Sequence, residues 1–438
     1  MTSEKLLQTM AVPSYPGVFV LGSFARYVTV YSQQVRALNL IDALCRRGML
    51  SRHTRVAVIG GGVAGLTAAA GAAVLGAPVR LYERAAKPLR LQRNCGHRWL
   101  HPHLYDWPER ESDSREAGLP LLTWEAGWAQ DVAKRIEAQW DHIRQLEGVT
   151  LDPVFDVEDI SLARSPVKDL TQVSWKQRGE AFQEELFHIV ILALGFGEEV
   201  DSPQSYWAED PLAFHELGEP RWVVSGTGDG GLTDLMRLCL DLKHEDILQT
   251  VVAENGLESI KRELLEASSK DDFQALSSKL EVQPLVKKFC GKLRNVRVFV
   301  CGRQPDLYSA GSAILNRFIV ALIAQAQEWW GGRYLYTSPT RSSEFKSRKR
   351  SSHLKMVRTW KRSIPSTLYK DMAPPRHCRS TSETFGTTAQ HSVRYGKNSC
   401  RGAMTPGKSI FAPNILCQKR LRTAHAFASA SVRKSVVW

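Results

Sequence analysis

Short apolar runs, each followed by a glycine turn and then by a helix-like stretch, recur along the first 330 residues. Four apolar residues at 56–59 precede a glycine-rich turn and a small-residue helix that we expect to end near residue 75. A second buried strand is predicted at 79–82, and the same order recurs at 222–240 and from residue 296 onward. Strands that alternate with helices predict an α/β fold built on parallel sheets.

The region before this pattern, residues 1–54, is expected to supply a strand and a helix that pack on the next domain. An alternating stretch at 28–31 predicts a short strand, and apolar spacing predicts an amphipathic helix that ends near residue 48. The polar turn at 31–34 could instead face a ligand.

A phosphate-binding turn is predicted where the first strand ends, at Gly60-x-Gly62-x-x-Gly65. Gly60 would permit the tight turn, Gly62 would let the backbone approach a pyrophosphate, and Gly65 would let the helix lie close to the sheet. The helix amino terminus would then offer unpaired N–H groups to the phosphates. The pattern favours a dinucleotide site over a plain glycine-rich turn.

An acidic residue follows the second strand at the spacing that such a site requires. Glu83 lies 23 residues after Gly60, where a carboxylate can accept hydrogen bonds from the adenosine ribose. The same carboxylate would repel a 2′-phosphate and so argues against NADP at this site, although Arg84 weakens that exclusion.

These residues resemble the FAD-binding motif of the two-dinucleotide-binding-domain flavoproteins, a group that includes flavin monooxygenases and pyridine-nucleotide-dependent reductases. The resemblance lies in VAVIGGGVAGL at 56–66 and LYE at 81–83. It implies a Rossmann-like FAD-binding half with a β-meander at 55–200 and an inserted second Rossmann-like domain at 201–295. The implied FAD-binding residues of the motif are Gly60, Gly61, Gly62, Ala64, Gly65, Glu83 and Arg84.

The return of the chain to the first half is expected through strands at 171–176 and 186–197. Residues 190–195 resemble the hydrophobic-Ala-Thr-Gly element of the same group, with Leu194 in the position where Thr is common, and Gly195 is its glycine. The departure leaves the predicted strand unchanged.

A second glycine motif, Gly226-x-Gly228-x-x-Gly231, follows a predicted strand at 222–225. The resemblance implies a nicotinamide dinucleotide, NAD(P)H, at this position. The helix-like stretch at 241–268 shows no second strand that ends in an acid or an Arg, and Asp229 would lie near the phosphates. An extension of the flavin site and a structural turn are therefore alternatives.

Residues 296–330 predict a returning βα unit. In the flavoprotein group a late strand often ends in Gly-Asp, and its Asp binds the ribityl chain. Here Gly302 is followed by Arg303, so either Asp306 takes that part, or the element lies elsewhere, or it is lost.

The segment at 90–135 is rich in Trp, His and Arg. The resemblance implies that Trp99 and an Arg, either Arg93 or Arg98, contact the flavin by stacking and by charge. The alternative is a loop that anchors itself by burying these side chains. No catalytic acid or base is assigned, and His97 and His101 would be mutated first. A metal site is not expected, because Pro102 interrupts the histidine spacing.

Charge separates the end of the chain from its body. The 438 residues carry a net charge of +13, yet residues 331–438 hold 22 Lys and Arg against 3 Asp and Glu, which leaves 36 against 42 before them. We expect this region to be an irregular basic tail. It could be an arm that binds nucleic acid, a weakly patterned part of the fold, or a segment translated out of frame.

The eight cysteines include no CxxC pair, and no apolar run is long enough to cross a membrane. We expect a cytoplasmic FAD-dependent oxidoreductase that acts on a small molecule and is reduced by NAD(P)H. The aromatic segment favours a monooxygenase over a simple reductase. The alternatives are an oxidase that uses FAD alone and a non-catalytic dinucleotide-binding module with a basic arm.

Overall fold

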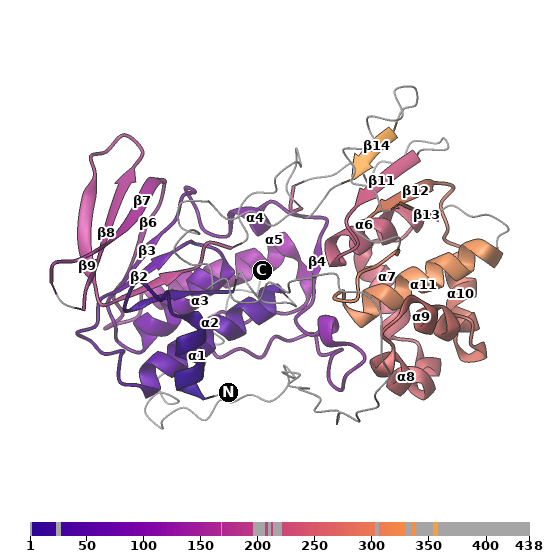
Figure 1. Cartoon of the computed structure of the whole chain (residues 1–438), viewed down its shortest axis with the longest axis horizontal. Helices are drawn as coiled ribbons and strands as arrows, with labels where there is room; N and C mark the ends of the chain where they lie inside the picture. The colour runs from indigo at the N-terminus through magenta and orange to yellow at the C-terminus, as the bar shows by residue number, and fades with distance from the viewer. Residues whose placement is uncertain are drawn as a thin grey trace, which may run out of the picture.

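Two parallel β-sheets, each with its own helices, form the two ends of the molecule in the computed structural model (Figure 1). The structure describes residues 2–22, 28–167, 169–195, 206–208, 212, 221–302, 306–329, 335–338 and 354–357. A middle segment lies between the ends and contains α4 (Arg90–Arg93), β4 (Trp99–Leu100), η1 (Leu104–Asp106), β5 (Gly127–Trp128) and α5 (Ala129–Arg144). The predicted α/β class with parallel sheets is confirmed.

The first sheet has five parallel strands within the described residues. Their order is β1 (Val18–Val20), β10 (Ile189–Leu192), β2 (Val56–Ile59), β3 (Val79–Tyr82) and β6 (Leu151–Val154). Every residue of β2 and β10 is buried, which explains why these strands are unbroken apolar runs: both faces of the sheet are covered.

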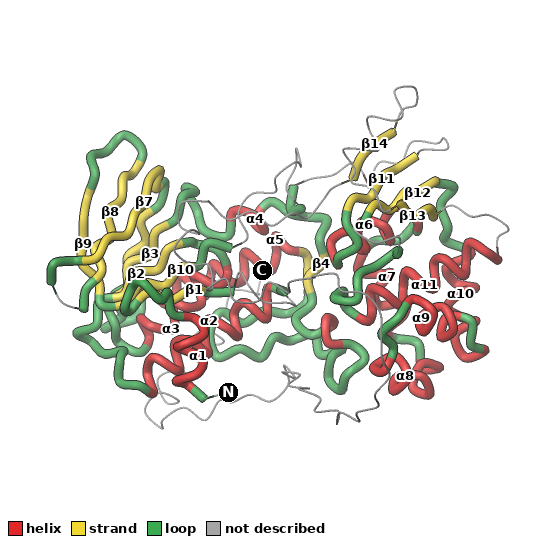
Figure 2. The backbone as a smooth tube through the Cα atoms, in the orientation of Figure 1, coloured by secondary structure: helices red, strands yellow, loops and turns green. Residues whose placement is uncertain are grey.

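Opposite faces of this sheet pack against different layers. Val56 and Val58 face a core formed with α2 (Val30–Arg46), α3 (Val63–Val74) and α5. Ala57 and Ile59 face the antiparallel meander seen beside the sheet in Figure 2, which consists of β7 (Val157–Arg164), β8 (Thr171–Gln177) and β9 (Gln183–Phe187). The predicted strand at 171–176 corresponds to β8. The predicted strand at 186–197 corresponds to the end of β9 and to β10, through which the chain returns to the first sheet.

The amino-terminal strand lies earlier than the sequence predicted. Residues 28–31 do not form a strand, because Thr29 and Ser32 make a reciprocal capping box: each backbone N–H donates to the other side chain at 2.9 Å. That box starts helix α2 at Val30, in spite of the β-branched residues there. The strand is β1, which is preceded by helix α1 (Ser3–Met10) and pairs with β10 at the edge of the first sheet.

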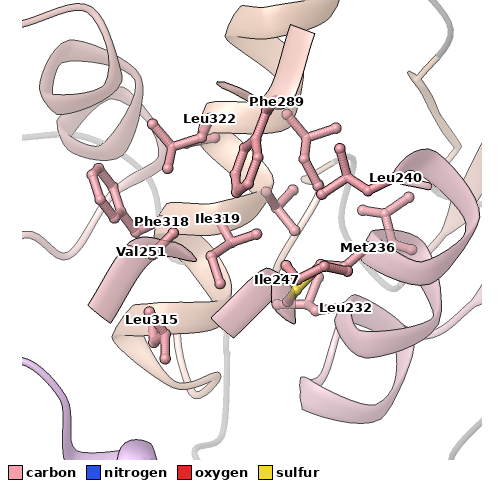
Figure 3. Close-up of a cluster of buried hydrophobic side chains, with 14 of the residues drawn as sticks. Leu232, Met236, Leu240, Ile247, Val251, Phe289, Leu315, Phe318, Ile319 and Leu322 are labelled. Carbon is pink, nitrogen blue, oxygen red and sulfur yellow. The ribbon is translucent and has the colours of Figure 1, made fainter. Parts of the chain in front are cut away.

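In the part of the chain that the structure describes, the second sheet has four parallel strands. Their order is β13 (Leu335–Ser338), β12 (Arg297–Cys301), β11 (Arg221–Ser225) and β14 (Leu354–Val357). Its helices are α6 (Asp229–Cys239), α7 (His244–Val252), α8 (Lys261–Glu266), α9 (Lys270–Ser277), α10 (Gln283–Cys290) and α11 (Ile314–Trp329), with 3₁₀ turns η3 (Asn255–Ile260) and η4 (Leu280–Val282). Figure 3 shows apolar side chains of α6, α7, α10 and α11 meeting in one buried cluster.

Two expectations about the later chain change. Strand β12 does not return to the first sheet, since it pairs with β11, so the βα unit at 296–330 extends the second sheet. The expected irregular tail contains two strands, β13 and β14, one at each edge of that sheet. Apart from β14, residues 339–438 lie outside the described residues. The three interpretations of that tail concern these residues.

No helix in the described ranges combines the length and the apolar character that a membrane crossing needs.

Candidate functional site

The first glycine turn is held by close backbone contacts. Gly60 has φ +114°, and its N–H donates to the Tyr82 carbonyl at 2.8 Å. A Cβ on Gly60 would lie 2.3 Å from the Ala193 carbonyl oxygen, and one on Gly65 would lie 1.8 Å from that of Gly60. The fold itself therefore requires both glycines.

The middle glycine is in a different situation. A Cβ on Gly62 would meet no protein atom within 4 Å, and Gly62 is exposed at the start of α3. The protein would tolerate a side chain there, so the open space above Gly62 is available to a ligand that approaches the helix amino terminus.

Glu83 directs its carboxylate back to this turn. One oxygen accepts the Gly61 N–H at 2.5 Å and the other accepts the Ala85 N–H at 2.8 Å. The carboxylate thus lies beside the glycine turn, on the neighbouring strand, as a ribose contact requires.

The remaining predicted contacts of the first site are spread out. Ala64 lies in the first turn of α3, Gly195 lies beyond β10 at the same sheet edge, and Arg84 is exposed after Glu83. Arg93 forms an ion pair with Glu137 of α5. Trp99 is buried in the hydrophobic cluster that includes side chains of α6, α7 and α11.

The second glycine turn has nearly the same backbone conformation as the first. Gly226 has φ +112° and its N–H donates to the Cys301 carbonyl at 2.8 Å. A Cβ on Gly231 would lie 2.2 Å from the Gly226 carbonyl oxygen, whereas one on Gly228 would meet nothing within 4 Å. The helix-capping residues Gly62 and Gly228 have φ, ψ of −76°, 177° and −84°, 177°. The two turns therefore present their N–H groups in the same way.

Asp229, the first residue of α6, is engaged by a neighbouring helix. One carboxylate oxygen accepts the Ala313 N–H and the Asn316 amide, both at 2.8 Å, at the start of α11. The other accepts the Tyr105 hydroxyl at 2.8 Å. Burial raises the pKa of Asp229, and these three donors oppose the rise. Asp229 thus caps α11 and ties the segment between the sheets to the second glycine turn.

The edge of the first sheet also carries a feature that the sequence analysis missed. β1 ends at Val20, and the next residue, Leu21, is in the row of residues that holds Gly60 and Glu83, with Gly22 directly after it. Gly22 has φ +82°, and a Cβ there would lie 2.0 Å from Oε1 of Gln33 on α2. The signal was present, because VFVLG at 18–22 is an apolar run that ends in glycine, like VAVIG at 56–60.

Gln33 carries an unused donor at this edge. Among the described residues its buried Nε2 has no hydrogen-bond partner. A buried amide without a partner is costly, so a polar ligand or water is expected beside it. Residues 31–34 are not a turn but the start of α2, and of their two glutamines only Gln33 offers a donor to a ligand, because Gln34 is buried and bonds Trp124 and the Leu122 carbonyl.

Two histidines of the middle segment bond the backbone, whereas His97 lies 3.7 Å from the Cys95 sulfur. His101 Nδ1 accepts the N–H groups of His103 and Leu104, and burial, with help from neighbouring His103 and Arg115, lowers its pKa to about 4. His103 Nε2 lies 2.9 Å from the Glu116 carbonyl oxygen. In the described part of the chain no three His, Cys, Asp or Glu side chains are grouped to hold a metal ion.

A buried ion pair joins the middle segment to the second sheet. Arg98 NH1 and Asp234 Oδ1 of α6 are 2.6 Å apart, and their side chains are 1% and 3% exposed. The Arg98 guanidinium also stacks on the Tyr206 ring at 4.0 Å. Burial, followed by the charges of Arg98 and Arg237, lowers the pKa of neighbouring His244 to about 3, so this imidazole is neutral.

A family model described as "Alanine dehydrogenase/PNT, C-terminal domain" matches residues 46–142, a span that contains β2, α3 and β3. The match is consistent with a Rossmann-like fold for that part of the chain. No curated protein matches this sequence.

Several solved structures are similar at low identity. The thioredoxin reductase of Lactococcus lactis shares 13% identity over 65% of this chain and 64% of its own, with a TM-score of 0.32. The bacillithiol disulfide reductase Bdr of Staphylococcus aureus shares 10% over 65% and 66%, with a TM-score of 0.36. A cyclohexanone monooxygenase shares 19% over 42% and 37%, with a TM-score of 0.29. This chain spans less than two thirds of the length of each of them.

Proposed function

We propose that this chain is an FAD-dependent oxidoreductase that is reduced by a nicotinamide dinucleotide bound at its second glycine turn. The observation that carries the proposal is the pair of matching glycine turns at the carboxyl edges of two parallel sheets, each with an open middle glycine. In such sheets dinucleotides bind at the carboxyl ends of the strands. Two turns of this kind in one chain support two dinucleotides.

The first turn fits FAD at three points. The N–H groups that follow Gly62 would hold the pyrophosphate, and Glu83 would accept the hydroxyls of the adenosine ribose. Because Glu83 lies on the β3 side of the turn, the other half of the dinucleotide must extend toward β10 and β1. Gly195 and Gln33 lie on that side. β1 is two strands from β2, or roughly 10 Å, within reach of a dinucleotide.

When bound, FAD supplies the electron-accepting chemistry, and the protein orients it and sets its electrostatics. Only the aromatic segment at 90–135 favours a monooxygenase. Its residues Trp99, Trp107 and Trp124 are buried in hydrophobic cores. Their burial supports the alternative of a self-anchoring loop, so we propose the reaction only as an oxidoreduction of a small molecule.

Two matched variants test whether the turns bind different cofactors. Gly62→Ala and Gly228→Ala each add one methyl group into open space, so both should leave the thermal midpoint of unfolding unchanged. We expect Gly62→Ala to weaken FAD binding at least about tenfold, and Gly228→Ala to slow anaerobic flavin reduction by NAD(P)H while FAD stays bound.

Absorption spectra of the FAD-reconstituted full chain give both readouts. A chain that takes up no flavin contradicts the proposal. A flavin that is bound but is reduced by neither NADH nor NADPH leaves the oxidase alternative. Equal effects of the two substitutions on FAD binding would mean that both turns serve one cofactor.

Gln33→Leu tests the direction in which FAD lies. We expect about a tenfold loss in affinity for FAD, since FAD would lose the hydrogen-bond donor that the buried amide provides, and no change in affinity for ADP, which would occupy only the Gly62 and Glu83 end. Calorimetric titration of the full chain with each ligand measures this. An equal loss of affinity for ADP and for FAD would mean that Gln33→Leu disturbs the fold and does not remove a contact with FAD.

A further inference from the structure

The second turn differs from the first at the position that contacts the ribose. In the first sheet Ile59 pairs with Tyr82, so the next residues along the two strands are Gly60 and Glu83. In the second sheet Ser225 pairs with Cys301 in the same parallel manner, so the next residues are Gly226 and Gly302. The equal 2.8 Å bonds from Gly60 N–H to Tyr82 O and from Gly226 N–H to Cys301 O confirm this equivalence.

Gly302 therefore stands where the first site has its carboxylate. The equivalent residue does not lie in the helix-like stretch at 241–268, because the strand beside β11 is β12, which follows a helical insertion. The sequence continues from Gly302 with Arg303, which lies outside the described residues.

A carboxylate at this position decides between two nucleotides. It accepts hydrogen bonds from the 2′-hydroxyl of NAD(H) and repels the doubly charged 2′-phosphate of NADP(H). Glycine does neither. We propose, on the basis of the function proposed above, that the second site accepts NADP(H), the 2′-phosphorylated dinucleotide that Glu83 excludes from the first site.

Two other carboxylates are close in sequence to Gly228 and to Gly302, namely Asp229 and Asp306. Asp229 is engaged by Ala313, Asn316 and Tyr105. Asp306, four residues beyond Gly302, lies near enough to Tyr308 to raise the pKa of that phenol, a smaller contribution than those of burial and of Arg317. Asp306 is the rival ribose contact, and its removal belongs in the test.

The test is calorimetric titration of the FAD-loaded full chain with NADP⁺ and with NAD⁺. We expect the wild type to bind NADP⁺ at least as tightly as NAD⁺. Gly302→Glu, which restores the arrangement of the first site, should weaken NADP⁺ at least about tenfold and change NAD⁺ less than about threefold. Gly302→Ala, the control without charge, should affect both ligands equally, and Asp306→Asn should not alter the preference.

Each other outcome overturns the inference in a distinct way. A wild type that binds NAD⁺ tenfold more tightly than NADP⁺ contradicts the inference but not the proposed function. If Asp306→Asn then removes the preference for NAD⁺, Asp306 is the ribose contact. A Gly302→Glu variant that treats both ligands alike shows that residue 302 does not contact the ribose. Binding of neither ligand removes the nicotinamide site itself, and with it this inference.

Discussion

Substitution of Asp234 by Leu should destabilise the protein more than any other single change that we consider, by about 3–5 kcal/mol in the free energy of unfolding. Asp234 is 3% exposed and lies 2.6 Å from Arg98 and 3.6 Å from Arg237, whose side chains are 1% and 9% exposed. Its loss leaves two buried guanidinium groups without this carboxylate. Urea unfolding of the full chain, followed by tryptophan fluorescence, measures the change.

Arg98→Met provides the comparison that separates this reason from a simple loss of contacts. It leaves Asp234 beside Arg237, so the cost should be smaller than that of Asp234→Leu, although the stacking on Tyr206 is lost as well. The double variant should be more stable than the sum of the two losses predicts.

An exposed ion pair supplies the matched control. Arg135 and Glu125 are 3.0 Å apart with side chains 53% and 56% exposed, so Arg135→Met should cost no more than about 1 kcal/mol. If Asp234→Leu costs as little as Arg135→Met, the buried pair does not hold the middle segment to the second sheet.

Gly65→Ala is the second change with a large expected effect. The added methyl carbon would lie 1.8 Å from the Gly60 carbonyl oxygen, a backbone atom that cannot rotate away. Helix α3 must then move off strand β2, at a cost of about 1–3 kcal/mol or more. The same displacement carries the N–H groups after Gly62 away from the phosphate position, so we expect affinity for ADP to fall by at least about tenfold.

A second glycine of the same helix serves as the control for Gly65. A Cβ on Gly71 would meet Ile41 at 3.4 Å, an ordinary contact, and alanine is favoured over glycine inside a helix by up to about 1 kcal/mol. Gly71→Ala should therefore leave stability and ADP affinity unchanged or improved. A Gly65→Ala protein with wild-type stability and affinity would contradict the close packing of this turn.

Local patterns were sufficient for the elements that carry their own signal. The strand at 56–59 lies where an unbroken apolar run predicted it, because both faces of a parallel sheet are buried, and the predicted strand at 79–82 is present as well, with only Arg80 partly exposed. The helix after Gly62 starts where the glycine motif indicated. The predicted strand at 28–31 was wrong, because the Thr29–Ser32 capping box outweighs the preference of β-branched residues for strands.

Only some residues of the candidate site could be predicted from local sequence patterns. Gly22 and Gln33 come together because β1 lies beside β10, and nothing in the spacing between residues 18 and 192 specifies that pairing. The position of Gly302 opposite Gly226 likewise depends on the pairing of β12 with β11 across a helical insertion. Strand pairing joins residues distant in sequence, so the pattern of each strand alone does not encode its neighbour.

The sequence by itself determined the α/β class, both glycine turns and the acidic residue of the first, since backbone strain at Gly60 and Gly226 and strand burial act within a few residues. Tertiary structure decided which strands are neighbours, and therefore which side chains share an edge with each turn. It also decided that Asp229 caps α11 and that Arg98 and Asp234 form a buried pair. Those contacts depend on desolvation and on the meeting of distant segments, which no local pattern records.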